Sequence, residues 1–147
     1  MAGKSFRSDI YIYGPTGNGK THLAASIINH RLWEGRTQHA FIKATRLILD
    51  IKSAIANNDT DVVINKHKAG HLLIIDDVGV ENLGEYVMEC WYEILDYRYC
   101  WAYPTIITSN LTPVELANKY GMRLASRILS GKRIKLTGPD YRLKGQE

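Results

Sequence analysis

The sequence predicts an α/β fold in which a five-stranded, mostly parallel β-sheet carries helices on both faces. The first observation is that predicted strands alternate with predicted helices along most of the 147 residues. The second is a glycine-rich octapeptide, residues 14–21, which lies between an apolar strand and an amphipathic helix. The third is the uninterrupted apolar run at 72–75, which is typical of a strand buried on both faces of a parallel sheet.

The first half of the chain is expected to hold two strands and two helices. Residues 9–13 are rich in β-branched and aromatic side chains and predict a strand, and residues 38–43 predict another. Helical spacing predicts two apolar stripes, one of Leu23, Ala24, Ile27, Ile28 and Leu32 and one of Leu47, Ile48, Ile51 and Ile55. Residues 57–70 are polar and predict an irregular segment with helical content in its second half.

The middle of the chain continues the alternation after the buried strand at 72–75. A helix is predicted over residues 85–99, and its inward-facing residues are Val87, Trp91, Ile94 and Leu95. Residues 105–108 predict the next strand, and Pro104 stands at a first strand position, where proline is tolerated.

The C-terminal part is expected to complete the sheet. Thr112 and Pro113 open a short helix, because a threonine cap followed by proline is a helix start signal. A further helix is expected around residues 123–129 and a last strand around 133–136. This strand would be the fifth.

Residues 14–21 match the phosphate-binding pattern G-x-x-x-x-G-K-[ST] in full. Glycines let the backbone turn with its N–H groups pointing inward, and the following helix adds the positive end of its dipole. The pattern predicts that Lys20 reaches the β- and γ-phosphates and that the Thr21 hydroxyl is a ligand of Mg²⁺. The residues expected to bind ATP or ADP are therefore Gly14, Pro15, Thr16, Gly17, Asn18, Gly19, Lys20 and Thr21.

Two carboxylates follow the buried strand at 72–75, and an amide follows the strand at 105–108. Ligands of open α/β sheets bind at the carboxyl ends of the strands, where Asp76, Asp77 and Asn110 are expected to meet. Asp76 is predicted to hold Mg²⁺, usually through water. Asp77 is predicted to orient and deprotonate the attacking water, and Asn110 to bind the γ-phosphate or that water.

Composition places the chain among ordinary globular proteins, with 45% apolar and 23% charged residues. No run approaches the roughly 20 apolar residues of a bilayer span, and residues 1–5 precede no apolar signal segment, so a cytoplasmic protein with no membrane partner is expected. Cys90 and Cys100 lie about 15 Å apart along one predicted helix, which is too far for a disulfide. The histidines are scattered, so no structural zinc is expected.

The net charge of +4 is concentrated near the C-terminus. Residues 121–147 contain seven Lys or Arg and two acids, a net +5, which leaves −1 for the first 120 residues. Two interpretations remain open at this point: a solvated basic tail, or a surface that meets the phosphates of a nucleotide or a nucleic acid.

Several motifs together resemble the DnaC/DnaI helicase loaders, which are AAA+ ATPases of bacteria and phages and are close to the IstB transposition helpers. The resemblance covers nearly the whole chain, with its motifs in order, at residues 14–24, 73–79, 94–99, 104–111, 125–128 and 138–142. It implies a P-loop NTPase fold of the AAA+ type and a role in DNA replication. It also implies partners: a replicative DNA helicase, single-stranded DNA, and further copies of the chain in a ring or spiral.

The resemblance also implies roles for three residues outside the loop pattern. Arg127 resembles an arginine finger that reaches the γ-phosphate held by a neighbouring subunit, and Arg142 resembles a second sensor for the nucleotide of its own subunit. His22 belongs to the nucleotide-binding motif. A guanidinium suits both arginine roles because its forked donors match phosphoryl oxygens. The alternative for both arginines is a solvated basic face.

Residues 1–147 are expected to form a single AAA+ core that lacks two parts of the family. The first strand begins by about Asp9, which leaves no room for the N-terminal helicase-binding segment, and the end at Glu147 leaves none for a helical lid domain. For single-stranded DNA, the candidate residues are Lys43, Arg46, Lys52, Lys66 and Lys68, which form either a groove of cations or solvated helix faces.

The leading hypothesis is an ATPase core of a helicase loader, with slow hydrolysis that depends on assembly. An IstB-like transposition helper would share every catalytic residue. A nucleotide-binding interaction module with little hydrolysis is a third possibility. A small-molecule kinase would share the phosphate-binding loop, but Asp76, Asp77, Asn110 and Arg127 together argue against it.

Overall fold

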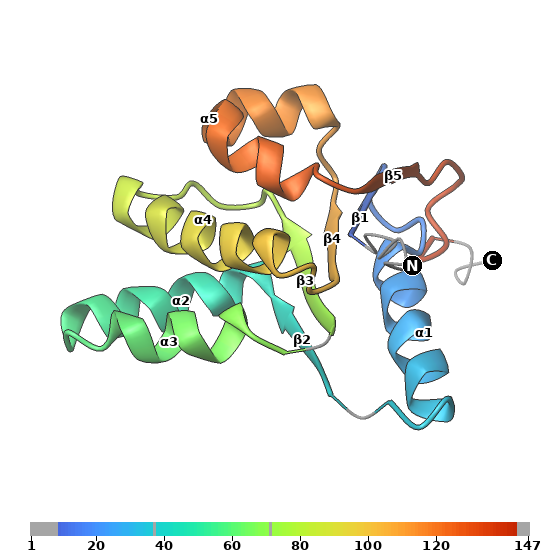
Figure 1. Cartoon of the computed structure of the whole chain (residues 1–147). Helices are drawn as coiled ribbons and strands as arrows, with labels where there is room; N and C mark the ends of the chain where they lie inside the picture. The colour runs from blue at the N-terminus through green and yellow to red at the C-terminus, as the bar shows by residue number, and fades with distance from the viewer. Residues whose placement is uncertain (1–8, 37, 71, 144–147) are drawn as a thin grey trace, which may run out of the picture.

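The computed structural model describes residues 9–36, 38–70 and 72–143, and expectations about residues 1–8 and 144–147 lie outside this part. Five strands form one sheet in the order β2-β3-β4-β1-β5, and every pair of neighbours is parallel (Figure 1). The strands are β1 (Ile10–Tyr13), β2 (His39–Lys43), β3 (Leu72–Val78), β4 (Thr105–Ser109) and β5 (Lys132–Lys135). The predicted α/β fold with a five-stranded parallel sheet is confirmed.

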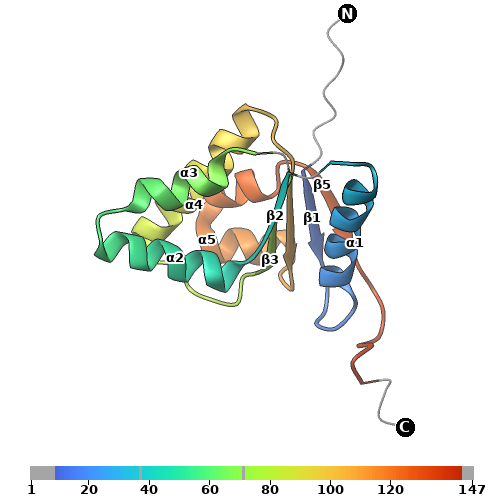
Figure 2. The same cartoon turned by 90° about the horizontal axis from the view of Figure 1, so that it is seen from below.

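Helices cover both faces of the sheet unequally. They are α1 (Lys20–Trp33), α2 (Ala44–Ala56), α3 (Thr60–Lys68), α4 (Glu85–Cys100) and α5 (Pro113–Ile128). Figure 2 shows α1 alone on one face and the other four helices on the opposite face. The sheet therefore separates a small apolar layer under α1 from a much larger one.

Alternation along the central strands supplies both layers. Ile74 and Ile106 belong to the small layer with Ala24 of α1, whereas Ile75 and Ile107 belong to the large one. All of these side chains are at most 2% exposed, so β3 is buried on both faces as its unbroken apolar run predicts. Burial of each of these isoleucine side chains contributes about 1.5–3 kcal/mol, which makes β3 and β4 the stable centre that holds the site.

The segment at 57–70 is more regular than its polar sequence predicts. It forms α3 from Thr60 to Lys68, because Ile64 packs into the large apolar layer while most neighbouring side chains face solvent. The stripe of α2 also differs by one residue, since Ala54 is buried and Ile55 is 37% exposed. The helix α3 has only two buried side chains, Ile64 and His67, which is too weak a pattern to predict the whole helix from sequence.

The two helical segments predicted after β4 are continuous in α5 except for a kink. Thr112 and Glu115 form a capping box, with Pro113 in the first turn, as expected for a helix start. Gly121 interrupts the helix with φ 82° and ψ 160°. On α4, Cys90 is buried and Cys100 is exposed, and both are free thiols as expected. Among the described residues, no helix has the length and apolar character needed to cross a bilayer.

Candidate functional site

The loop between β1 and α1 bends through glycines. Gly17 and Gly19 have φ of 78° and 91°, a region that side chains with a Cβ rarely adopt. At Gly17 a Cβ would also overlap the carboxylate of Asp140. The loop begins beside the central strands, where the Gly14 N–H donates to the Ser109 carbonyl of β4 at 3.3 Å. Two elements of the sheet therefore fix the loop's entry.

Lys20 is 7% exposed and points into the loop that precedes it. Its Nζ donates to the carbonyls of Gly14 at 2.9 Å and Pro15 at 2.6 Å, and to Asn18 Oδ1 at 3.2 Å. Burial lowers the pKa of Lys20, while the nearby Asp77 opposes that shift. The ammonium is thus held at the centre of the loop, within reach of an anion bound there.

Asp76 is 2% exposed and connects three elements. Its Oδ1 accepts hydrogen bonds from Thr21 Oγ1 of α1 at 2.9 Å and from Thr108 Oγ1 of β4 at 2.7 Å. The backbone N–H of Asp77 donates to the same Thr108 hydroxyl at 2.9 Å. The pairing of β3 with β4 is irregular between Ile75 and Val78, and Asp77 has φ 62°. Neighbouring carboxylates therefore differ in burial: Asp76 is enclosed and Asp77 is exposed.

A cavity of about 640 Å³ opens at the carboxyl ends of the strands, above the phosphate-binding loop. Ten of the predicted site residues are part of its wall. The wall consists of Thr16, Gly17, Gly19, Lys20, Thr21, His22, Lys43, Asp76, Asp77, Thr108, Asn110, Tyr141 and Arg142. Asn110 Nδ2 donates to Thr16 Oγ1 at 3.2 Å, which joins the end of β4 to the loop.

Three residues of the loop motif do not line the cavity but make hydrogen bonds within and next to the loop. Gly14 and Pro15 offer their carbonyls to Lys20, and Asn18 is 7% exposed with its Nδ2 donating to the Leu136 carbonyl at 2.8 Å. None of the three is part of the cavity wall. The carbonyls of Gly14 and Pro15 and the side chain of Asn18 therefore shape the loop, whereas the sequence pattern assigned the whole octapeptide to nucleotide contact.

The segment after β5 returns to the loop. The Tyr141 N–H donates to the Gly17 carbonyl at 3.0 Å, and the Arg142 N–H donates to Asp140 Oδ1 at 2.9 Å. Tyr141 and Arg142 then line the cavity, and the charge of Arg142 contributes to the lowered pKa of Lys20. The C-terminal basic residues are thus not one tail, because Arg142 faces the same cavity as the loop.

The donor set fits a magnesium nucleotide. The first turn of α1 has neither a side-chain cap nor an acidic residue, so its backbone N–H groups are available to phosphate oxygens. Lys20 supplies a positive charge beside them. The Thr21 hydroxyl and the Asp76 carboxylate are hard oxygen ligands, which Mg²⁺ prefers.

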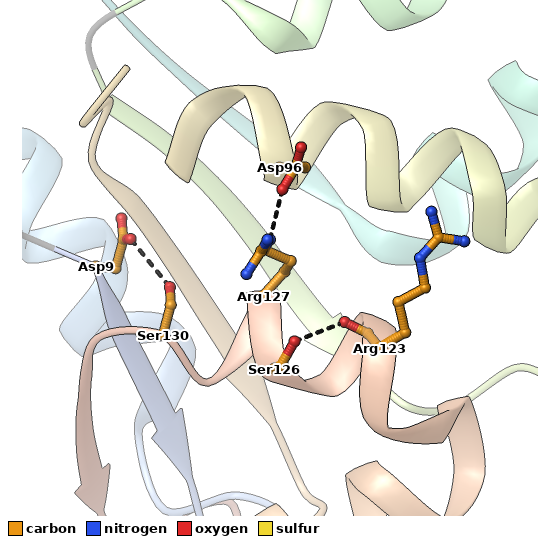
Figure 3. A network of polar contacts seen from close by, with 6 residues as sticks. All are labelled: Asp9, Asp96, Arg123, Ser126, Arg127 and Ser130. Carbon is orange, nitrogen blue, oxygen red and sulfur yellow. Dashed lines mark hydrogen bonds and ion pairs between the residues drawn. The ribbon is translucent and has the colours of Figure 1, made fainter. Parts of the chain in front are cut away.

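Arg127 lies outside this cavity, on the part of α5 that packs against α4 (Figure 3). Its Nε donates to Asp96 Oδ1 at 2.6 Å, and its guanidinium carbon lies 4.5 Å from the centre of the Tyr99 ring. The structure thus brings together Asp76, Asp77, Asn110 and Arg142 but places Arg127 apart from them. A residue that serves the nucleotide of another subunit would be outside its own cavity.

The candidate DNA-binding residues do not share one surface. Lys43 ends β2 and lines the cavity, whereas Lys66 and Lys68 end α3 near the start of β3, at the opposite edge of the sheet. Arg46 pairs with Asp50 within α2 at 2.9 Å. Lys68 pairs with Glu93 at 3.2 Å. Within one subunit these side chains do not form a single groove, because Lys43 lies at the carboxyl end of its strand and Lys66 lines a different cavity; their role in DNA binding stays a prediction.

Three residues of the cavity wall were not predicted as nucleotide-site residues from the sequence, and one of them, Lys43, was predicted to contact DNA instead. Thr108 lies two residues before Asn110, so the period of a strand could have found it. Lys43 is the residue of β2 that pairs with Asp76 of β3, but this register is visible only in the sheet. Tyr141 reaches the cavity through the return of a segment without regular structure, which no local pattern predicts.

The strand order, the glycine loop with its lysine, and an aspartate that shares hydrogen bonds with the loop threonine define a P-loop nucleotide-binding domain of the AAA+ type. The sequence of residues 5–145 matches the family described as IstB-like ATP binding protein. The chain belongs to this family.

Known relatives include proteins of replication and transposition. The chain is 28% identical to the replicative helicase loader DnaI of Bacillus subtilis over 112 residues, 76% of this chain and 36% of that protein. It is 29% identical to the insertion sequence IS232 putative ATP-binding protein of Bacillus thuringiensis, over 94% of this chain and 57% of that protein. It is also 28% identical to the chromosomal replication initiator DnaA of Lactobacillus helveticus, over 92% of this chain and 30% of that protein.

Solved structures share the fold. Domain III of DnaA from Thermotoga maritima is 26% identical with a TM-score of 0.82, covering 94% of this chain and 58% of that one. A DnaI structure is 27% identical with a TM-score of 0.76, covering 90% and 72%. A DnaA structure bound to AMPPCP and single-stranded DNA is 24% identical with a TM-score of 0.82, covering 92% and 42%. The chain spans about a third of the length of the DnaA and DnaI relatives.

Proposed function

We propose that this AAA+ module binds ATP with Mg²⁺ in the cavity above the phosphate-binding loop, hydrolyses it slowly, and serves a helicase loader in DNA replication. The observation that carries the proposal is the pair of hydrogen bonds from Thr21 and Thr108 to the buried Asp76. They join the phosphate-binding loop to the strand that carries Asp77. Asp77, which follows the proposed metal ligand Asp76, is thereby fixed relative to phosphates that the loop would bind.

Each residue of the cavity has a task in this proposal. Lys20 and the first turn of α1 hold the phosphates, and Thr21 with Asp76 holds Mg²⁺, which would neutralise phosphate charge. Asp77 orients the attacking water and accepts its proton. Asn110 donates a hydrogen bond to the γ-phosphate or to that water. Arg142 contacts the nucleotide of its own subunit.

Arg127 would complete the site of a neighbouring subunit, since it lies outside its own cavity. Hydrolysis would then depend on assembly into a ring or spiral. This dependence gives ATP a switching role: binding orders the subunits, and hydrolysis releases them. The likeness to the helicase loader DnaI supports a replicative helicase as the partner. The fold shared with a DnaA structure bound to single-stranded DNA supports single-stranded DNA as a second partner.

A transposition helper is the second candidate function. It is favoured by the IstB-like family match and by the IS232 relative, whose length the chain spans to 57%. Both candidates use the same nucleotide chemistry, so only the partner separates them. Retention of the protein by an immobilised replicative helicase in the presence of ATP would favour the loader, and retention only by a transposase would favour the helper.

The nucleotide site itself is tested by Lys20→Met. Loss of a charge-assisted hydrogen bond to phosphate, worth about 1.5–3 kcal/mol, should weaken ATP binding roughly 10- to 100-fold. Calorimetric titration with ATP measures this, and chelation of Mg²⁺ with EDTA should abolish hydrolysis by the wild type. Lys52→Met, on the exposed side of α2, is the matched control and should bind ATP normally. Normal binding by Lys20→Met would refute the assignment of the loop.

A further inference from the structure

The backbone that carries Arg127 is anchored on both sides of the residue. Leu129 N–H donates to the Ala125 carbonyl at 2.8 Å, which closes the end of α5. Directly after the helix, Ser130 Oγ donates to Asp9 Oδ2 at 3.2 Å, as Figure 3 shows. Asp9 is itself fixed, because its Oδ1 accepts the Thr105 N–H of β4 at 2.9 Å. The position of the Arg127 backbone is thus set by the sheet, and only its side chain remains to be oriented.

Asp96 of α4 orients that side chain. Its Oδ1 accepts from Nε of Arg127 at 2.6 Å, and both side chains are partly enclosed, at 34% and 26% exposure. The Tyr99 ring lies 4.5 Å and the Tyr92 ring 5.7 Å from the guanidinium carbon. The hydrogen bond to Asp96 uses Nε and is the main cause of the raised pKa of Arg127, and a side-chain hydrogen bond with Tyr92 is a smaller cause. The carboxylate of Asp96 therefore does not occupy the forked end of the guanidinium.

Arg123, one turn earlier on α5, provides a contrast. Its terminal nitrogen Nη1 pairs with Glu89 Oε1 at 3.0 Å, with both side chains more than 60% exposed. This ion pair resembles an ordinary surface pair, which contributes little to stability. Two arginines on one helix are thus held by two carboxylates of α4, but at different ends of the guanidinium.

We propose that Asp96 is a positioning residue, which holds the Arg127 guanidinium by Nε so that its two terminal nitrogens face the γ-phosphate bound by a neighbouring subunit. This inference rests on the proposed function, in which Arg127 acts between subunits. A free arginine side chain loses rotamer entropy when it becomes ordered. Asp96 removes that loss before assembly, and the paired charge keeps the side chain partly enclosed.

The proposal predicts that Asp96→Ala lowers assembly-dependent ATP hydrolysis about tenfold, the effect of one charge-assisted hydrogen bond on a rate. The KM for ATP should be unchanged, because Asp96 does not line the cavity. Asp96→Glu retains the carboxylate and should recover most of the rate. Glu89→Ala is the matched control, since it removes the neighbouring ion pair between the same two helices, and it should retain wild-type activity. Thermal unfolding of each variant verifies that it is folded.

Mixtures of variants distinguish positioning of Arg127 from general damage. Asp96→Ala mixed with Lys20→Met should regain activity, because Lys20→Met subunits supply an intact Arg127 to the intact cavities of their neighbours. Asp96→Ala mixed with Arg127→Ala should regain none, since both lack a positioned arginine. Recovery in the second mixture, or a rate for Asp96→Ala equal to or above the wild type, would overturn the proposal.

A spectroscopic readout keeps the inference separate from the proposed function. The ¹H–¹⁵N signal of Arg127 Nε–H, identified by its loss in Arg127→Lys, should shift in Asp96→Ala and stay in place in Glu89→Ala. An unshifted signal in Asp96→Ala refutes the contact whatever the hydrolysis rates are. A shifted signal with no dependence of wild-type hydrolysis on protein concentration would instead overturn the action between subunits, and with it the proposed function.

Discussion

Asp76 and Asp77 are chemically identical neighbours whose surroundings separate their tasks. Asp76 is enclosed and receives hydroxyl hydrogen bonds from two elements, which fix its carboxylate as a metal ligand would need to be fixed. Asp77 has a left-handed backbone and an exposed side chain that lines the cavity. The change of backbone direction between them lets one carboxylate face the loop threonine while the other lines the cavity.

The role of Asp77 as a base is tested by Asp77→Asn. Asparagine tolerates φ 62° about as well as aspartate, so this substitution removes the base without adding backbone strain. Hydrolysis should fall at least about 100-fold, the usual contribution of a general base, while the Kd for ATP stays within roughly threefold. Single-turnover rates and calorimetry measure the two quantities. Asp61→Asn, an exposed change in the first turn of α3, is the control and should alter neither the hydrolysis rate nor the Kd for ATP. Wild-type turnover by Asp77→Asn would exclude Asp77 as the general base.

At the scale of elements, the sequence predicts those helices, strands and loops that have a strong local pattern. The phosphate-binding loop, β3 and the start of α5 each carry a strong local signal: a complete motif, an unbroken apolar run, and a cap followed by proline. The helix α3 was predicted only in part, as helical content in the second half of 57–70, because its burial depends on Ile64 and His67, which form no stripe. Lys43 lines the cavity because β2 pairs with β3, and Asp96 contacts Arg127 because α4 packs on α5. Contacts between elements set these placements, so periodicity could not reveal them.

The kink of α5 depends on Gly121. Its φ of 82° is unfavourable for a side chain, although a Cβ would meet no atom within 4 Å. Gly121→Ala should therefore destabilise the fold by about 1–2 kcal/mol through backbone strain alone. Urea denaturation followed by circular dichroism measures the free energy of unfolding. Gly84→Ala is the control, because Gly84 has φ −66° and equally open surroundings, and it should change the free energy clearly less.

If instead both glycine variants were equally stable, the strain at Gly121 would not be the reason for the kink.

Gly121→Ala should also affect ATP hydrolysis. The second half of α5 carries Arg127, so a straightened helix would move the guanidinium away from Asp96. Gly121→Ala should therefore also lose assembly-dependent hydrolysis, even at temperatures where it remains folded.

At the scale of the whole molecule, the candidate functional residues form two groups. The cavity at the carboxyl ends of the strands holds the loop, the two aspartates, Asn110 and Arg142. Arg127, near the end of α5, is held against α4 by Asp96 and is not part of the wall of that cavity. One subunit thus presents a nucleotide site and, elsewhere, an arginine suited to phosphate. The central claim of the proposed function is that two copies of the chain bring such groups together.

The rate of ATP hydrolysis per subunit, measured as total protein concentration rises, tests this claim most directly. For the wild type, the rate per subunit should rise with concentration as assemblies form. Arg127→Ala and Lys20→Met should each be inactive alone, yet a mixture of the two should hydrolyse ATP, because one supplies the intact cavity and the other the arginine. A rate per subunit that stays constant with concentration, together with wild-type activity in Arg127→Ala, would contradict it.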